Sequence, residues 1–258
     1  MDRRPNIAVI PARHHATRFP GKPLALIDGV PMVVRVAERV RLAATIDQIW
    51  VATDDRRIWE VVREAGFEAV MTASTCSSGT DRVARALELR PNVTPQWVIN
   101  VQGDEPLIDP AALDRLVRAA SDRPEAIHTL ARPSAHSSEV DDANHVKVAM
   151  TAAGRALYFS RAPIPHGGDF RIHIGVYAFT PPLLRRFVNR APTALESVER
   201  LEQLRALELD IPIYITMCWD GRPTIGVDEP ADIARVEAML RASSDAVPPE
   251  PHWIPGTT

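Results

Sequence analysis

Cysteine is scarce in this chain of 258 residues. Its 2 cysteines, Cys76 and Cys218, lie far apart and form no CxxC pair or Cys/His cluster. A disulfide framework needs several paired cysteines, and a zinc site needs Cys or His ligands at close spacing. The sequence therefore excludes both, and we expect two ordinary thiols.

The chain also has no long apolar run, few aromatic side chains and no excess of positive charge. No stretch approaches the roughly 20 apolar residues of a membrane-spanning helix, and the N-terminal MDRRPNIAVIPAR has no apolar signal-peptide core. Aromatic residues make up 5% of the chain and its formal net charge is −3. The chain thus lacks the positive field that nucleic-acid binding requires. We expect a cytoplasmic protein with neither a membrane nor a nucleic-acid partner.

The first 125 or so residues alternate apolar runs with amphipathic helical patterns, which predicts an α/β fold with a doubly wound, mostly parallel sheet. The predicted strands are Ile7–Ile10, Gln48–Thr53, Phe67–Met71 and Trp97–Val101. The predicted helices are Met32–Leu42, Asp55–Ala65 and Asp81–Leu89.

After Pro124 the strand candidates become shorter and mix with Pro and Gly turns, which indicates an inserted smaller lobe. Its predicted strands are Ile127–Ala131, Val146–Met150 and Ile172–Phe179. One long helix over Leu195–Leu209, a strand over Ile213–Met217 and a last helix over Pro230–Ala242 are expected to follow. Residues 246–258 are Pro-rich, and we expect a mobile tail.

The most informative segment is Ile7–Leu24, IAVIPARHHATRFPGKPL, in which a short apolar strand leads into a basic loop. Arg13, Arg18 and Lys22 follow the strand with no acid among them. Ligands of doubly wound sheets bind at the carboxyl ends of such strands, where a basic loop can hold a polyphosphate. The spacing is not that of a Walker P-loop. A solvated basic surface loop is the alternative on charge alone.

Two segments present carboxylates next to a glycine. In VINVQGDEPLIDP, a strand ends at Gly103 before Asp104, and in GVDEPADIARVEAML, Asp228 stands just before a Pro-initiated helix. Magnesium prefers hard oxygen ligands such as these carboxylates. Helix capping is the alternative function of such acids, and Asp109 before Pro110 is a helix start of that kind.

Further polar strings have the same two interpretations. SSGTDRVARALE is typical of a helix N-cap, although its backbone donors could also cradle a nucleotide. His173 and Tyr177 are four residues apart, which places them on one face of a strand, where a lone histidine is usually a core residue. Glu202 and Arg205 could form an intrahelical ion pair.

In order and spacing these strings match PAR…TR.PGKPL, SGT(E/D)R, QGDEP, YFSRA.IP, H.GIY, LEQLR and GVDTPEDL. The chain therefore resembles the 3-deoxy-manno-octulosonate (Kdo) cytidylyltransferase family over roughly residues 6 to 240. The resemblance implies a nucleotide-diphospho-sugar-transferase-like, Rossmann-like fold and transfer of CMP from CTP to a small acidic acceptor, with release of pyrophosphate. Kdo is the default acceptor.

The resemblance also implies site residues. Arg13, Lys22, Asp104 and Asp228 would be catalytic, with Asp104 and Asp228 as ligands of Mg²⁺. The nucleotide-binding residues would be Pro11, Ala12, Arg13, Thr17, Arg18, Lys22, Ser78, Gly79, Arg82 and Gln102. The acceptor-binding residues would be Gln102, Arg161, His173, Tyr177, Glu202 and Gln203.

The implied organisation is one domain over residues 1–245. A nucleotide-binding half would span about 1–125, an acceptor and dimerisation lobe about 126–220, and a returning metal-binding segment with its helix 221–245. The expected partners are CTP, the acceptor and a second copy in a homodimer.

The sequence departs from the family pattern at two places. His14, His15 and Ala16 follow the PAR string, so a hydroxyl is lost and its role must pass to Thr17 or to backbone groups. The segment 167–172, GGDFRI, is shorter than the loop of the resembled enzymes. The Ala, Arg and Pro bias also suggests a GC-rich genome. A phosphonate or another sugar acid is therefore an alternative acceptor, and a catalytically silent nucleotide-binding module is a further alternative.

Overall fold

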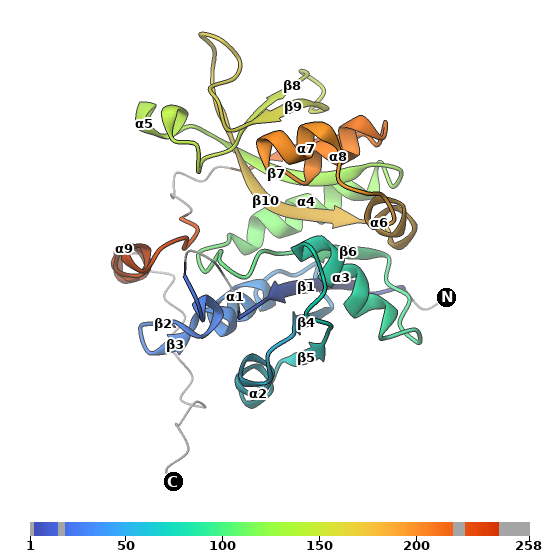
Figure 1. The fold of residues 1–258 in the computed structure, drawn as a ribbon, viewed down its shortest axis with the longest axis vertical. Coiled ribbons are helices and arrows are strands. Elements are labelled where there is room, and N and C mark those ends of the chain that lie inside the picture. Colours follow the sequence, from blue (N-terminus) through green and yellow to red (C-terminus); the bar gives the residue numbers. More distant parts are fainter. Residues whose placement is uncertain (1–2, 15–18, 219–224, 243–258) are drawn as a thin grey trace. The chain divides into compact units, whose positions relative to one another are not determined.

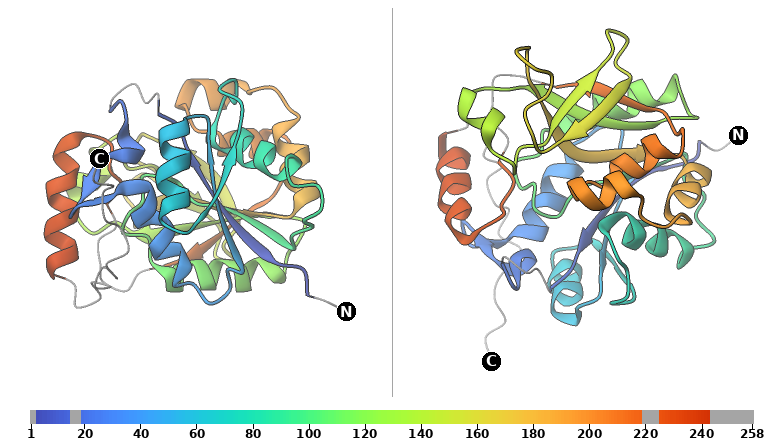
Figure 2. Two further views of the ribbon diagram at one scale, coloured as in Figure 1. Left: turned by 90° about the horizontal axis from the view of Figure 1, so that it is seen from below. Right: turned by 45° about the horizontal axis from the view of Figure 1, so that its top comes forward.

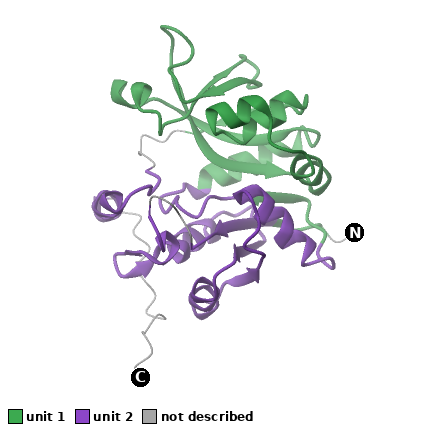
Figure 3. Cartoon of the chain, viewed as in Figure 1, with its two compact units in different colours: residues 1–6, 94–99, 111–223 green, residues 7–93, 100–110, 224–258 purple. Residues whose placement is uncertain are grey.

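The computed structural model describes residues 3–14, 19–218 and 225–242. The chain forms two compact units, each built from several separate segments (Figure 3). Unit 1 comprises residues 1–6, 94–99 and 111–223, and unit 2 comprises residues 7–93, 100–110 and 224–258. The chain thus leaves unit 2 twice and returns to it twice, whereas the sequence suggested one excursion, over about residues 126–220. The expected tail, 246–258, lies outside the described residues.

Unit 2 has a parallel sheet with the strand order β1-β4-β5 (Figure 1). Its elements are β1 (Asn6–Ala12, of which Asn6 belongs to unit 1), η1 (Lys22–Leu24), β2 (Leu26–Ile27), β3 (Val30–Pro31), α1 (Met32–Arg41), β4 (Gln48–Thr53), α2 (Arg56–Glu64), β5 (Glu68–Met71), α3 (Gly79–Glu88) and α9 (Pro230–Ala242). Residues Ile7 to Ile10 of β1 are fully buried, as expected for a parallel strand covered on both faces.

Two helices of unit 2, α2 and α3, begin at side chains that cap them. Asp55 accepts the backbone N–H of Arg57 at the start of α2, and Ser78 and Asp81 form a reciprocal capping box at the start of α3. Helix α9 lies against the β2–β3 hairpin, as Figures 1 and 2 show. The predicted strand and helix positions in this unit are confirmed to within two residues.

Unit 1 has a mixed sheet in which β11 pairs in parallel with β7, and β7 pairs with β10, β10 with β8 and β8 with β9 in antiparallel orientation. Its elements are β6 (Trp97–Asn100, of which Asn100 belongs to unit 2), α4 (Pro110–Ser121, of which Pro110 belongs to unit 2), β7 (Ile127–Pro133), α5 (Ser137–Asp141), β8 (Lys147–Met150), β9 (Ala156–Ser160), β10 (Arg171–Phe179), α6 (Pro181–Val188), α7 (Ala194–Glu199), α8 (Gln203–Glu208) and β11 (Ile213–Met217).

The prediction of one helix over Leu195–Leu209 is wrong. Helix α7 ends at Arg200, whose backbone adopts the left-handed conformation (φ 56°, ψ 46°), and α8 begins three residues later. The carbonyls of Glu199 and Arg200 accept hydrogen bonds from the Arg161 guanidinium, at 2.9 and 3.4 Å. Because the break is stabilised by a distant side chain, the helical periodicity of the segment could not reveal it. Within the described residues, no helix is long and apolar enough to span a membrane.

Candidate active site

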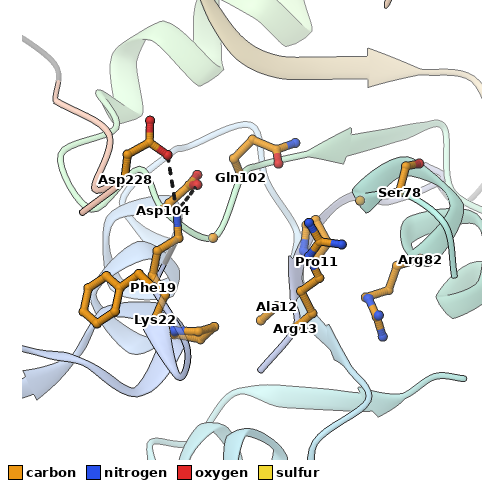
Figure 4. A pocket seen from close by; sticks show the side chains of 13 residues that line it. Pro11, Ala12, Arg13, Phe19, Lys22, Ser78, Arg82, Gln102, Asp104 and Asp228 are labelled. Atoms are coloured by element: carbon orange, nitrogen blue, oxygen red, sulfur yellow. Dashed lines mark hydrogen bonds and ion pairs between the residues drawn. The ribbon is translucent and has the colours of Figure 1, made fainter. Parts of the chain in front are cut away.

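A cavity of about 280 Å³ lies in unit 2 at the carboxyl end of β1. It is lined by Pro11, Ala12, Arg13, Phe19, Lys22, Pro23, Ser78, Gly79, Arg82, Gln102, Gly103, Asp104 and Asp228. Figure 4 shows Lys22, Asp104 and Asp228 together at one end, Ser78 and Arg82 at the other, and Arg13 between them. The cavity thus has a charged end rich in carboxylates and a second end at the start of α3.

At the charged end, Lys22 binds both predicted metal ligands. Its Nζ donates to Asp104 Oδ2 at 2.6 Å and to the Val227 carbonyl at 2.7 Å, and it lies 3.8 Å from Asp228 Oδ1. The Lys22 and Asp104 side chains are only 14% and 34% exposed. The structure therefore brings together a lysine and two acids from three distant segments of the chain.

Asp104 reaches this position because the turn before it packs closely on β1. The Val101 N–H donates to the Val9 carbonyl at 3.1 Å. A Cβ atom on Gly103 would lie 2.9 Å from the Pro11 carbonyl oxygen. Only glycine leaves room for that approach, which explains the residue type before Asp104.

Asp228 is positioned by hydrophobic packing. Val227 is fully buried with Ile27, Met32 and Val236, and Phe19 and Leu107 pack against this cluster. The basic loop, the turn after β6 and the last segment thereby share one core.

A second acid, Asp232, binds the backbone donors at the start of α9. Asp232 Oδ2 accepts the backbone N–H groups of Asp228 and Glu229, at 2.9 and 3.0 Å. The acid that occupies the start of α9 is therefore Asp232, while the Asp228 carboxylate lies beside Lys22.

At the other end of the cavity, Arg82 is 2% exposed and is bound by residues that do not line the cavity. Its guanidinium donates to Asp54 Oδ2 at 2.9 Å and to Thr72 Oγ1 at 2.6 Å. Ser78 caps α3, as the sequence predicted, and also lines the cavity. Near the middle, Gln102 donates to Asn100 Oδ1 at 3.2 Å, and Asn100 in turn donates to Thr80.

Most of the predicted nucleotide-binding residues therefore line one cavity, with the exceptions of Thr17 and Arg18, which lie outside the described residues. Phe19, Pro23 and Gly103 line it too and were not predicted as site residues. Each is adjacent to a predicted residue in the sequence, so the signal was present.

The cavity offers the donor atoms that magnesium prefers, which are carboxylate and carbonyl oxygens. Three such oxygens, from Asp104, Asp228 and Val227, already surround one cation, the Lys22 ammonium group. Among the described residues no group of three or more His, Cys, Asp or Glu side chains could hold a metal. A magnesium ion here would use the two carboxylates and take its other ligands from water and substrate.

The predicted acceptor-binding residues other than Gln102 belong to unit 1. His173 and Tyr177 lie on β10 with their ring centroids 5.5 Å apart, which confirms that they share a face. Thr129 Oγ1 lies 3.0 Å from His173 Nε2 and 2.7 Å from the Val176 carbonyl. Burial lowers the pKa of His173 to about 3, so its ring is neutral. Burial, with the nearby Glu202 carboxylate, raises the pKa of Tyr177 well above its usual value.

Gln203 and Arg161 lie at the junction of α7, α8 and β9. Gln203 is 4% exposed, and within the described parts of the chain its Nε2 has no hydrogen-bond partner. The Arg161 guanidinium donates to the carbonyls of Ala143, Glu199 and Arg200. Arg205 pairs with Glu196, at 2.7 Å from its Nε.

The sequence of residues 7–213 matches the family model for cytidylyltransferases. It is 46% identical over 242 residues to the 3-deoxy-manno-octulosonate cytidylyltransferase of Myxococcus xanthus, covering 92% of this chain and 96% of that protein. This chain belongs to the Kdo cytidylyltransferase family. Within this family it is also 47% identical over 243 residues to the same-named protein of Anaeromyxobacter dehalogenans, covering 92% of this chain and 98% of that one.

A solved structure of CMP:2-keto-3-deoxy-manno-octonic acid synthetase, complexed with CTP, supports the same assignment. Its sequence is 36% identical to this chain, and the two structures superpose with a TM-score of 0.85. The superposition covers 92% of this chain and 99% of the other. The likeness confirms the predicted Rossmann-like α/β fold. As a member of the cytidylyltransferase family, the chain is a nucleotidyltransferase.

Proposed function

We propose that the protein transfers CMP from CTP to the hydroxyl group of Kdo and releases pyrophosphate. The observation that carries the proposal is the cavity of unit 2, with its lysine and two carboxylates at one end and Ser78 and Arg82 at the other. The Kdo cytidylyltransferases to which the chain is similar over most of its length support Kdo as the acceptor.

The triphosphate would occupy the part of the cavity between Lys22 and Arg13. Both side chains are cationic, and a triphosphate needs nearby positive charge to leave water. The nucleoside would then lie toward Ser78, Gly79 and Arg82, at the first turn of α3. The first turn of α3 contains no proline, so each of its residues keeps a backbone N–H group. Such groups at the start of a helix are suited to binding oxygen atoms of a nucleotide.

Asp104 and Asp228 would hold Mg²⁺, since they supply the hard oxygens that this ion prefers. When bound, magnesium would stabilise the negative charge that develops on the transferred phosphate. In this structure Lys22 neutralises the two carboxylates. Once Mg²⁺ neutralises them instead, Lys22 would donate to phosphate oxygens of the nucleotide. Lys22 is thus suited to both the free and the nucleotide-bound states.

The acceptor hydroxyl would attack the α-phosphorus of CTP, the bond from that phosphorus to the bridging oxygen would break, and pyrophosphate would leave with the electron pair. Such a transfer depends on positioning and charge stabilisation. Arg13, Lys22 and Arg18 would stabilise the leaving pyrophosphate, and the hydroxyl proton would pass to water.

In unit 1, the acceptor would be bound by Arg161, His173, Tyr177, Glu202 and Gln203. The Gln203 amide supports this assignment, because a buried N–H without a partner among the described residues is costly unless a ligand accepts it. Neutral His173 would also be a hydrogen-bonding group rather than a charge.

We further propose that two copies associate through α7 and β9 of unit 1. Val198 and Leu195 on α7 are 80% and 39% exposed, and Leu157 on β9 is 58% exposed. The two elements are neighbours, since Ser160 donates to Glu199 at 2.8 Å. Neighbouring exposed apolar side chains of this size are typical of a protein interface.

The test is pyrophosphate release with CTP and Mg²⁺ across a panel of acceptors. The panel contains Kdo, other sugar acids and small phosphonates. We expect Kdo to exceed its competitors in kcat/KM by a wide margin, on the order of 10⁴, because a site built for specific polar groups rejects ligands that leave those groups unpaired. Preference for a phosphonate would overturn Kdo as the acceptor, and failure to release pyrophosphate with every acceptor would overturn the transfer itself.

A further inference from the structure

Arg82 is held by a buried carboxylate that lies outside the cavity wall. Asp54 follows β4 directly, and its Oδ2 accepts from Arg82 Nη2 at 2.9 Å. The Arg82 and Asp54 side chains are 3% and 12% exposed. In the part of the chain that the structure describes, Asp54 is the only carboxylate paired with this guanidinium. A buried arginine needs such a partner, because its charge would otherwise be stranded away from water.

The remaining contacts hold the other terminal nitrogen of the guanidinium. Nη1 donates to Thr72 Oγ1 at 2.6 Å and, more weakly, to the Ala73 carbonyl at 3.5 Å. Thr72 Oγ1 in turn donates to the Thr53 carbonyl at 3.1 Å, one residue before Asp54. The carboxyl end of β4 and the segment after β5 thus clamp Arg82 on the side away from the cavity.

A guanidinium carries five N–H donors. Asp54, Thr72 and Ala73 use three of them, so two donors have no partner among the described residues, and Arg82 lines the cavity. Arginine has no acceptor, so these donors are suited to acceptor atoms of a ligand that enters the cavity and displaces water. Cytosine presents two adjacent acceptors, O2 and N3, whereas uracil carries a hydrogen on N3.

We propose that Asp54 is a positioning residue that aims Arg82 at the cytosine ring and thereby sets the preference for CTP over UTP. This inference rests on the proposed use of CTP. Asp54 does not touch the nucleotide itself. It acts by fixing the orientation of the Arg82 guanidinium, as supporting side chains orient ligand-binding side chains in other sites.

The test compares Asp54→Asn with the wild-type enzyme by calorimetry and by steady-state kinetics with CTP and UTP. We expect the affinity for CTP and for cytidine to fall by the same factor, on the order of 10- to 100-fold, which is the contribution of a charge-assisted hydrogen bond. The kcat/KM preference for CTP over UTP should fall with it. Lys22→Ala is the contrast, since it should weaken CTP far more than cytidine.

Asp55→Asn is the matched control. Asp55 is the neighbouring acid, but it caps α2 and pairs with the exposed Arg57 outside the cavity. This variant should keep both affinities and the CTP preference. A purely structural role for Asp54 predicts a lower Tm with an unchanged preference for CTP over UTP, and that result would overturn the inference.

If Asp54→Asn does not fold, Asp54→Glu takes its place, because it keeps the charge and displaces the carboxylate. An unchanged CTP preference in a folded Asp54→Glu variant with normal Tm would contradict the inference as well. A wild-type protein that binds neither CTP nor cytidine would instead refute the proposed function. A wild type that binds both, with Asp54→Asn indistinguishable from it, would refute only the role of Asp54.

Discussion

At the scale of single residues, the most consequential contact is the one between Lys22 and two acids. Two carboxylates that approach one point repel each other unless a cation lies between them. Lys22 Nζ provides that cation, at 2.6 Å from Asp104 and 3.8 Å from Asp228. The proposed Mg²⁺ would bind at this point, between the same two carboxylates.

Asp104→Asn and Asp228→Asn should each lower kcat by roughly 10²–10³-fold, since a strong electrostatic contact in an active site contributes about 3–4 kcal/mol. The measurement is pyrophosphate release at saturating Mg²⁺, with circular dichroism to show that the fold survives. Glu229→Gln is the control, because this acid is adjacent to Asp228 and exposed. Near-wild-type turnover of either Asn variant would remove that carboxylate from the metal site.

The lowered pKa of the half-buried His173 should make the protein sensitive to acid. Burial lowers its folded pKa from 6.5 to about 3, so the unfolded chain binds a proton below about pH 6.5 that the folded chain excludes. Stability is therefore lost as the pH falls from 6.5 toward 3. Between pH 7 and 5 the wild type should lose about 2 kcal/mol more unfolding free energy than His173→Gln.

Urea denaturation of the wild type, His173→Gln and His166→Gln at the two pH values measures this difference. His166 is exposed and serves as the control. Equal acid sensitivity of the wild type and His173→Gln would show that His173 is not the group responsible.

At the scale of elements, short turns position the active-site side chains. The turn after β6 can bring Asp104 to the carboxyl end of β1 only because Gly103 lies against the Pro11 carbonyl. In unit 1, the reversal at Arg200 between α7 and α8 releases carbonyls that Arg161 binds. In both places a local backbone conformation is stabilised by a contact with a distant segment.

Gly103→Ala should strongly reduce kcat, because the added Cβ would lie 2.9 Å from a backbone oxygen that cannot yield. Gly79→Ala is the comparison, since its Cβ would meet the Pro11 side chain at 3.3 Å, which a small shift can relieve. The rates of pyrophosphate release by the two variants should differ by at least about 10-fold. That factor corresponds to roughly 1.4 kcal/mol of activation free energy, which we attribute to displacement of the turn that carries Asp104. Equal activities would show that the turn tolerates a side chain at residue 103.

Arg200→Gly should be more stable than Arg200→Ala. Arg200 is exposed and has φ 56°, a conformation that glycine adopts without the steric cost of a Cβ. Because both variants lose the Arg200 side chain, their difference isolates the backbone, and we expect roughly 0.5–1 kcal/mol in favour of glycine. Chemical denaturation of the pair measures it, and a more stable Ala variant would contradict the role of the left-handed residue.

At the scale of the whole molecule, the chain order separates two tasks. The segments that line the cavity come from residues 11–13, 19–23, 78–82, 102–104 and 228, all in unit 2. The long excursion through residues 111–223 forms most of unit 1 and carries the polar groups assigned to the acceptor, together with the exposed apolar side chains of α7 and β9.

The double variant Leu157→Asp with Val198→Asp should convert the proposed homodimer to a monomer, because two buried charges would oppose association. Sedimentation equilibrium measures the molecular mass in each case. Leu26→Asp is the control, since Leu26 is 50% exposed but lies on β2 of unit 2. A monomeric wild type, or a double variant that still dimerises, would contradict the proposed interface.

Local signals in the chain were enough to predict the elements of unit 2 and most of the residues that line its cavity. The buried run of β1, the periodicity of α1 and α2, and the cap at Ser78 can each be recognised within a few residues. The residue types of PAR, SGTDR, QGDEP and GVDEP, together with the family resemblance, indicated which side chains would bind the nucleotide.

Which of these side chains meet depends on packing between distant segments. Lys22, Asp104 and Asp228 converge because Phe19, Leu107 and Val227 share one hydrophobic cluster, and a sequence pattern does not encode such packing. The contact of Asp54 with buried Arg82 also depends on tertiary packing. In the sequence alone, Asp54 is an acid after a strand with no indication of its partner. Arg161 and the break at Arg200 depend on each other across many residues, so neither could be predicted alone. Long-range contacts of this kind are set by the mutual fit of distant segments, which local propensity does not contain.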